Sequence, residues 1–232
     1  MTEKIYTQEN SDYLKNNPTW HVEDSPWKAK QIIKMLDRNP LEIKSIAEVG
    51  CGVGEILNQL HHKLKNDINY TGYDVSIDAI SQAKKREKER LQFKHTNFLE
   101  TENRYDLLLM MDVFEHVDDY LGFIRSCRKK ANYTIFHIPL DIDVLGVLRN
   151  VPMKTREAVG HLHYFTKQTA LATLEDCGYE IIDSFYTAGM LDLPNKKLKT
   201  RIAAIPRKLM FKINKDFTVK LMGGYSLLVL AK

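Results

Sequence analysis

The chain has 232 residues, of which 44% are hydrophobic, and a formal net charge of +4 at pH 7. This length and composition fit one α/β domain with additions and argue against a disordered chain. The N-terminus is polar and no apolar run approaches the roughly 18 residues of a membrane span, so neither a signal peptide nor a membrane-spanning helix is expected. Three distant cysteines, Cys51, Cys127 and Cys177, lack C-x-x-C spacing and favour reduced thiols and a cytoplasmic location.

Residues 1–40 precede the first predicted strand, and the main domain is predicted at 41–232. Apolar residues at helical spacing predict one amphipathic helix in this segment: Ala29, Ile32, Ile33 and Leu36. The segment is also unusually aromatic, with Tyr13, Trp20, His21 and Trp27. We interpret it as N-terminal cap helices over a ligand cleft. A helix that only covers one edge of the sheet is the alternative, and it stays open.

A strand, a glycine-rich turn and a helix are predicted in succession after residue 45. Ile46, Ala47 and Val49 form a short apolar run, as in a parallel strand that is covered on both faces. Beyond the glycines, apolar residues recur with the spacing of one helix face: Val53, Ile56, Leu57, Leu60 and Leu64. Because glycine permits sharp turns and close approach to the main chain, we expect a ligand at this turn.

The spacing and charge of the turn indicate which ligand it binds. The order is G-x-G-x-G, and Glu55 stands where a dinucleotide fingerprint has its third glycine. A carboxylate there would repel a pyrophosphate, and together with Glu48 it suits a ligand that carries positive charge. S-adenosylmethionine, with a sulfonium, an ammonium and no phosphate, has that character. An ordinary glycine-rich turn is the alternative.

At this point the sequence resembles the class I S-adenosylmethionine-dependent methyltransferases, whose first motif has the form E-x-G-x-G-x-G. The motif is matched without a gap by Glu48, Gly50, Gly52 and Gly54. The resemblance implies that these four residues bind the cofactor.

A second strand, 68–74, ends in Asp74, and Val75 follows it. An acid at the end of the second strand, some 20 residues past the glycines, accepts hydrogen bonds from ribose hydroxyls in Rossmann-type units. We therefore predict that Asp74 and Val75 contact the cofactor. Asp74 could instead cap the helix that begins near Ile77, although Ser76 could serve as that cap.

The third strand, 91–95, leads to Asn97 and Phe98. The resemblance implies an acidic residue here that accepts from the adenine amino group, followed by an apolar residue that covers the ring. This chain has Asn97 in place of the acid, and an amide oxygen can still accept that bond. Asn97 and Phe98 are therefore predicted adenine contacts.

A fourth strand, 105–111, is followed by a polar loop that reads V-x-E-H-V from Val113. Ligands of open α/β sheets bind at the carboxyl ends of the strands, so Met111 and Asp112 are predicted cofactor contacts. Phe114 is predicted to cover the adenine. His116 is a candidate general base, and an orienting residue that never touches substrate is its alternative role.

The fifth predicted strand, 133–139, precedes a long segment, 140–165, that we interpret as a lid loop. G-H-x-x-x-F-T closes it from Gly160, a motif found at this place in many small-molecule methyltransferases of the class. His161 and His163 are therefore the first candidates for a catalytic base. These histidines with Asp141 and Asp143 offer ligand types for a metal, but no fixed ligand spacing is present, and we predict no metal site.

The last two strands, 179–186 and 224–230, are separated by a basic amphipathic insertion at 188–222. Residues 195–215 carry eight basic residues and no acid: Lys196, Lys197, Lys199, Arg201, Arg207, Lys208, Lys212 and Lys215. Pro206 is expected to break any single helix there. The element could lie on an anionic membrane, capture an acidic or phosphate-bearing substrate, or only cover the site. Nucleic acid is not expected, because aromatic residues are not interleaved beyond Phe211.

Together these features predict a Rossmann-like α/β fold: a seven-stranded, mostly parallel sheet with helices on both faces and an antiparallel last strand. The predicted activity is methyl transfer from S-adenosylmethionine to a small-molecule acceptor, with O-methylation ahead of N-methylation and a sugar or natural-product intermediate as the acceptor class. Two alternatives are a non-catalytic binding protein that keeps the cofactor fold at a membrane surface and a nicotinamide-dependent oxidoreductase.

Overall fold

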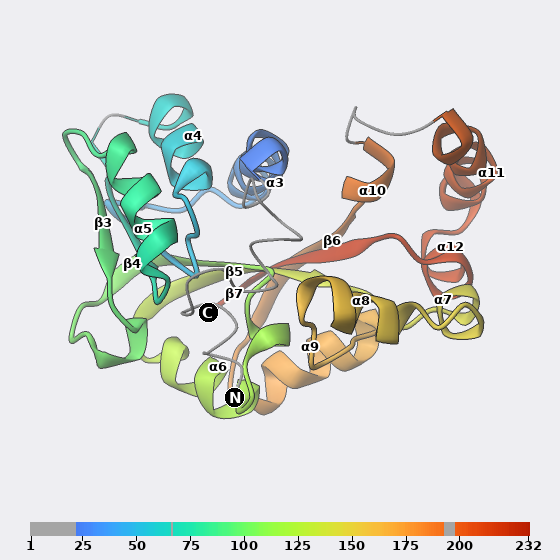
Figure 1. Cartoon of the computed structure of the whole chain (residues 1–232). Helices are drawn as coiled ribbons and strands as arrows, with labels where there is room; N and C mark the ends of the chain where they lie inside the picture. Colours follow the sequence, from blue (N-terminus) through green and yellow to red (C-terminus); the bar gives the residue numbers. More distant parts are fainter. Residues whose placement is uncertain (1–21, 66, 193–197) are drawn as a thin grey trace.

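The computed structural model describes residues 22–65, 67–192 and 198–232, and its centre is one seven-stranded sheet (Figure 1). The strands are β1 Ser45–Val49, β2 Asn69–Asp74, β3 Leu91–His95, β4 Tyr105–Met111, β5 Ala131–Pro139, β6 Ile181–Thr187 and β7 Ser226–Ala231. Their order across the sheet is β3-β2-β1-β4-β5-β7-β6. Only β7 runs antiparallel to its neighbours, β5 and β6, while the remaining pairs are parallel. The predicted fold class is confirmed.

Helices cover both faces of the sheet (Figure 1). They are α3 Ser25–Arg38, α4 Glu55–Lys63, α5 Ile77–Ala83, α6 Tyr120–Arg128, α7 Val144–Leu148, α8 Val151–Val159, α9 Lys167–Asp176, α10 Gly189–Asp192, α11 Leu198–Ile213 and α12 Lys215–Met222. Apolar residues of α3, α4 and α5 pack with one face of the sheet, and those of α6 and α9 pack with the other. Chain order reverses between β1 and β4, so the carboxyl ends of these two strands open onto a crevice where ligands bind in such sheets.

The helix α3 confirms the amphipathic pattern of its sequence. Ala29, Ile32 and Met35 are fully buried in the core that also holds Leu57 and Leu60 of α4. The helix therefore covers a face of the sheet rather than only an edge. The aromatic residues Tyr13, Trp20 and His21 of the predicted cap lie outside the described residues.

The segment predicted as a lid loop contains two helices, α7 and α8, so its prediction as a loop was wrong. Its sequence lacks helical periodicity because both helices are short and pack little of their surface. Residues at the helix starts define α7 and α8 instead. The Asp143 side chain caps α7 by accepting a hydrogen bond from the Gly146 backbone N–H, and Pro152 lies in the first turn of α8.

The insertion between β6 and β7 forms α10, α11 and α12, and α11 continues through Pro206. The expectation that proline would break a single helix was therefore wrong. Packing beyond the proline offsets its cost of roughly 3 kcal/mol. The Phe211 ring stacks on Tyr225 with centroids 4.6 Å apart, and Arg207 donates to the Met222 carbonyl at 3.0 Å.

The described residues also bear on the predictions about membrane-spanning helices and about the cysteines. No helix in the described ranges is long and apolar enough to cross a membrane. Cys51, Cys127 and Cys177 are buried free thiols.

Candidate active site

A cavity of about 1070 Å³ lies at the carboxyl ends of the parallel strands. Its wall is formed by the residues that follow β1, β2, β4 and β5, together with the first turn of α3 and part of the segment 140–165. This volume exceeds the roughly 300–1,000 Å³ of most small-ligand pockets, so it can hold a cofactor and an acceptor together.

The glycine turn, residues 50–54, needs glycine for measurable reasons. Gly50, Gly52 and Gly54 have φ angles of +67°, +52° and +76°, which side chains rarely adopt. A Cβ on Gly54 would lie 2.3 Å from the Phe93 ring, and a Cβ on Gly50 would lie 2.9 Å from Val113. Gly50 and Gly52 line the cavity, whereas Gly54 starts α4 and packs on β3.

Asp74 bridges the glycine turn and the start of α5. Its carboxylate accepts from the Gly52 backbone N–H and from the Ser76 backbone N–H, both at 2.8 Å. Ser76 itself caps α5 by accepting from Ala79, so Asp74 is not needed as the helix cap. Burial raises the pKa of Asp74, and the backbone hydrogen bonds counteract that rise. Asp74 and Val75 both line the cavity, where a ribose could reach them.

Glu48 is a buried acid with one carboxyl oxygen that lacks a hydrogen-bond partner among the described residues. It is 1% exposed, and its Oε2 has no hydrogen-bond partner among the described residues. Burial raises the pKa of Glu48 to about 8, although the positive charge of Lys28 lowers it. A cationic ligand would offset the cost of this buried carboxyl, so the residue fits the ammonium or sulfonium of S-adenosylmethionine.

A network of ion pairs at the cavity joins Lys28, Asp112 and His137. Of these residues, only Asp112 was predicted from the sequence as a site residue. Lys28 Nζ lies 2.7 Å from Asp112 Oδ2, and His137 Nδ1 lies 2.6 Å from Asp112 Oδ1. Burial would raise the pKa of Asp112, but the charges of His137 and Lys28 hold it well below its usual range. The only signal for His137 was its position near the end of a predicted strand. Lys28 had none, because its partner lies 84 residues away.

The predicted adenine contacts differ in their positions. Asn97, Phe98 and Met111 line the cavity, and the Asn97 Oδ1 accepts from the Leu99 backbone N–H at 3.0 Å. Phe114 does not line it. This ring is fully buried and packs against Phe165 with centroids 5.3 Å apart, so its predicted role in covering the adenine was wrong.

Two of the three candidate base histidines face the cavity. His161 Nδ1 lies 2.6 Å from Asp141 Oδ2, and His116 Nδ1 lies 3.2 Å from the Gly160 carbonyl oxygen. Burial and the neighbouring His161 lower the pKa of His116 to about 4, so its imidazole is neutral at pH 7.

His163 points elsewhere. Its Nε2 bonds to the Val117 carbonyl at 2.9 Å, and its ring packs on Tyr120 with centroids 4.2 Å apart. In a regular strand, residues i and i+2 face the same side, but His161 and His163 lie in an irregular segment and contact different surroundings. The prediction of His163 as a catalytic base was wrong because it does not line the cavity.

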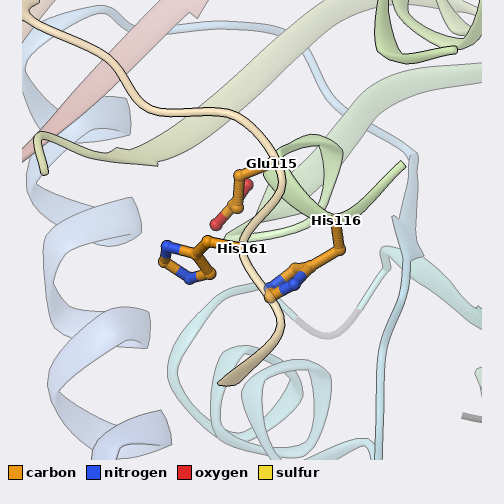
Figure 2. A group of neighbouring side chains, drawn as sticks. All are labelled: Glu115, His116 and His161. Carbon is orange, nitrogen blue, oxygen red and sulfur yellow. The ribbon is translucent and has the colours of Figure 1, made fainter. Parts of the chain in front are cut away.

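Glu115 lies behind the two cavity histidines, and Figure 2 shows its carboxyl group directed toward the His161 ring. Glu115 is fully buried, and neither carboxyl oxygen has a hydrogen-bond partner among the described residues. Burial, with the nearby charges of Asp112 and Asp141, raises the pKa of Glu115 well above its usual range. We call Glu115, His116 and His161 the Glu–His–His cluster.

The wall of the cavity is strongly acidic. Among the described residues that line it, Lys28 is the only lysine or arginine. The acids that line it are Asp24, Glu48, Glu55, Asp74, Asp112, Asp118, Asp119, Asp141 and Asp143. Such a field attracts cations and disfavours anions.

The arrangement can be compared with known proteins. A family model described as a methyltransferase domain matches residues 21–184. The chain belongs to this methyltransferase family. The activity predicted from the glycine turn is thus confirmed at the level of the enzyme class, and the nicotinamide-dependent oxidoreductase is set aside.

Known ubiquinone biosynthesis O-methyltransferases share low identity with the chain. The ubiquinone biosynthesis O-methyltransferase of Histophilus somni (strain 2336) is 28% identical over 169 residues, which cover 61% of this chain and 70% of that protein. Three further ubiquinone biosynthesis O-methyltransferases are matched over 32% to 42% of their own length.

Solved methyltransferase structures resemble the whole chain. Magnesium protoporphyrin IX methyltransferase from Synechocystis PCC 6803 with bound SAH has a TM-score of 0.59 at 16% identity, over 98% of this chain and 90% of that chain. The N-methyltransferase NodS from Bradyrhizobium japonicum WM9, in complex with S-adenosyl-l-homocysteine, has a TM-score of 0.56 at 15% identity, over 99% and 95%. At such identities the likeness establishes the fold.

Proposed function

We propose that this methyltransferase transfers a methyl group from S-adenosylmethionine to an oxygen of a small-molecule acceptor held in the same cavity. The observation that carries the proposal is the cavity itself: one wall holds the glycine turn with Glu48 and Asp74, and another holds His116 and His161. S-adenosylmethionine, when bound, supplies a methyl group that its sulfonium already activates.

The residues of the glycine half hold the cofactor in this proposal. Asp74 accepts from the ribose hydroxyls, and Glu48, with the acidic wall behind it, faces positive charge. Asn97, Phe98 and Met111 line the part of the cavity next to β3 and β4, where the adenine would lie. Because Asn97 Oδ1 already accepts from a backbone N–H, only its remaining lone pair is available to an amino group.

We assign activation of the acceptor to His161 and His116. In the reaction the acceptor oxygen forms a bond to the methyl carbon, the sulfur keeps the electron pair of the broken bond, and the hydroxyl proton passes to water. The His161–Asp141 pair fixes the orientation of the ring beside the cavity. The His161 ring is therefore placed to assist removal of the proton from a hydroxyl that the cavity holds in line with the donor.

The acidic residues that line the cavity indicate which charge its methyl acceptor can carry. The predicted capture of an acidic or phosphate-bearing substrate by the basic insertion is not favoured, because none of the described basic residues of α11 lines the cavity. A neutral or cationic acceptor suits the field, such as a sugar or a hydroxylated natural-product intermediate. The name of the similar Histophilus somni protein, an O-methyltransferase, supports oxygen as the acceptor atom.

The outer surface of α11 supports a peripheral contact with an anionic membrane. Ile205, Leu209 and Ile213 are exposed at four-residue spacing, so they form one stripe along the helix. Lys208 and Lys212 flank this stripe and are also exposed. An apolar stripe beside lysines is the composition of helices that lie on anionic lipid. We therefore propose a lipid surface as the partner of this face. The helix α12 packs on both α11 and α7, and α7 leaves Val144, Val147 and Leu148 exposed.

The experiment for the proposed function incubates the chain with methyl-labelled S-adenosylmethionine and a set of neutral phenols, sugars and amines. Label on an oxygen of a product identified by mass spectrometry is the expected result. Substituting His161→Ala should lower kcat at least tenfold with unchanged S-adenosylhomocysteine affinity, whereas His163→Ala should leave kcat unchanged. Cofactor binding without transfer to any acceptor would support the non-catalytic binding protein instead.

A further inference from the structure

The Glu–His–His cluster unites side chains that are distant in sequence but whose ligand atoms all lie within 4.8 Å of one another (Figure 2). Glu115 and His116 come from the 3-10 turn after β4, and His161 comes from the segment before α9. Two backbone hydrogen bonds tie the segments together, because the Leu162 and His163 N–H groups both donate to the Glu115 carbonyl. The cluster is therefore a built feature of the fold.

The geometry points to a divalent-cation site formed by Glu115, His116 and His161, in which the cation binds the oxygen of the methyl acceptor. Neither the H-x-H pattern nor the carboxylates near it in sequence predicted this set, and it replaces the expectation of no metal site. The inference rests on the proposed function and specifies how the histidines activate the acceptor: they hold a cation instead of taking the proton themselves.

The distances permit such a site with small movements. Three atoms within 4.8 Å of one another lie at most roughly 2.8 Å from a common centre, and metal bonds to histidine nitrogen and carboxylate oxygen measure about 2.0–2.2 Å. Shifts below about an ångström in each side chain would complete the coordination.

Partners on the opposite ring atoms support ligand roles for both histidines. His161 Nδ1 is 2.6 Å from the Asp141 carboxylate, and His116 Nδ1 is 3.2 Å from the Gly160 carbonyl. Metal-binding histidines in proteins engage their second nitrogen with a carboxylate or a backbone carbonyl in this way, which fixes the ring and its tautomer. For His161, this pairing with Asp141 leaves Nε2 as the nitrogen that would bind the cation.

The third observation is the Glu115 carboxyl itself. It is fully buried, both oxygens lack a hydrogen-bond partner among the described residues, and it stands among further acids of the cavity wall. An unpaired carboxylate in such a place is costly unless it is protonated or coordinates a cation. A cation between it and the two imidazoles would supply the missing partner.

The chemical types of the three ligands indicate which cations the site would bind. Two imidazoles and one carboxylate suit Zn²⁺, Fe²⁺ and Mn²⁺ better than Mg²⁺, which prefers oxygen ligands. Three protein ligands also leave coordination positions open, as in catalytic sites. The two histidines line the cavity, so these positions face the acceptor. A hydroxyl bound there would lose its proton to water more readily, and its oxygen would then attack the methyl group.

The first experiment measures binding of the metal alone. The full chain without a histidine tag is treated with EDTA, desalted and titrated calorimetrically with ZnCl₂ and, in parallel, with MgCl₂. One Zn²⁺ per chain, bound at least tenfold more tightly than Mg²⁺, is expected. Glu115→Gln and His161→Asn should each weaken Zn²⁺ binding at least tenfold, and Asp141→Asn should weaken it by about 10–100-fold as a positioning residue.

Two matched controls lie outside the cluster. His163→Ala removes the histidine that faces Tyr120, and His62→Ala removes an exposed histidine of α4. Both should keep the Zn²⁺ affinity of the parent chain. Unchanged S-adenosylhomocysteine affinity shows that each variant is folded, and if Glu115→Gln fails this check, His161→Asn decides. Equal Zn²⁺ affinity in the parent chain and a folded cluster variant would overturn the site.

A second measurement separates this inference from the proposed function. The chelated chain should transfer methyl at least tenfold more slowly than the same chain with Zn²⁺ or Mn²⁺ restored. Full activity after chelation would overturn the role of a cation in the reaction and leave the methyltransferase assignment intact. Cation binding that depends on the cluster, together with no transfer to any acceptor under either condition, would support the site and contradict the proposed O-methylation.

Discussion

The two halves of the cavity are built differently. The cofactor half consists of β1, the glycine turn, β2, the turn after β3 and the end of β4, and its key residues lie at or directly after the ends of these strands. The acceptor half brings together α3, the 3-10 turn after β4, the end of β5 and the segment 140–165. There the decisive contacts join residues far apart in sequence, such as Lys28 with Asp112 and His116 with His161.

The difference teaches where information about function lies in such a chain. In the cofactor half, backbone geometry demands particular residues, and glycine at positive φ is visible in the sequence. In the acceptor half, chemistry depends on which side chains meet across the cavity, and no local pattern records that. We expect substitutions in the cofactor half to act on stability and cofactor affinity, and those in the acceptor half to act on turnover and partners.

The strongest test of the cofactor half is Gly54→Ala. The new Cβ would lie 2.3 Å from the Phe93 ring at a φ of +76°, so strain and overpacking add. We expect the free energy of unfolding to fall by about 2–4 kcal/mol in urea denaturation. Gly52→Ala is the matched control, because nothing lies within 4 Å of its Cβ, and it should cost about 1–2 kcal/mol. Equal losses would show that packing on Phe93 is unimportant.

Asp74→Ala tests the ribose assignment. It should weaken S-adenosylhomocysteine binding by about 1–3 kcal/mol in titration calorimetry, because a charged acceptor is lost. Asp67→Ala removes the same charge from an exposed position and should not change the affinity. An unchanged affinity in a folded Asp74→Ala chain would mean that the residue only holds the Gly52 and Ser76 N–H groups.

Glu48→Gln tests how the free energy of unfolding depends on pH through a residue of the cofactor half. The pKa of Glu48 is raised to about 8 in the folded chain, so between pH 4.5 and 8 the unfolded chain releases a proton that the folded chain retains. The free energy of unfolding therefore falls as pH rises through this range. The substitution should reduce the fall between pH 5.5 and 7.5 by about 1–2 kcal/mol, measured by urea denaturation at both values. Parallel pH profiles of the two chains would contradict the raised pKa.

The smallest effect is expected on the outer surface of α11 and α12, away from the cavity. Changing Lys208, Lys212 and Lys215 together to Gln should lower sedimentation with anionic vesicles by roughly threefold to tenfold, about 1 kcal/mol. The control changes Lys63, Lys84 and Lys85, which are exposed near α4 and α5, on the opposite side of the molecule (Figure 1). Equal sedimentation of both triple variants and the parent chain would rule out this membrane contact.

Sequence alone determined the fold class and much of the cofactor half. Strand-length apolar runs, the E-x-G-x-G-x-G turn and the acid that ends β2 each reflect a local requirement of the backbone, and all of them lie where predicted. Thr166 caps α9 and Gly178 follows its end at positive φ, and such end signals involve only neighbouring residues.

Only the tertiary structure decided which side chains share the cavity. It placed Phe114 in the core and His163 against Tyr120, and it brought Lys28 to Asp112. It also showed that α11 passes through Pro206, since packing on Tyr225 outweighs a local helix-breaking preference. Glu115, His116 and His161 converge for the same physical reason: contacts between distant segments, not spacing along the chain, set the positions of their ligand atoms.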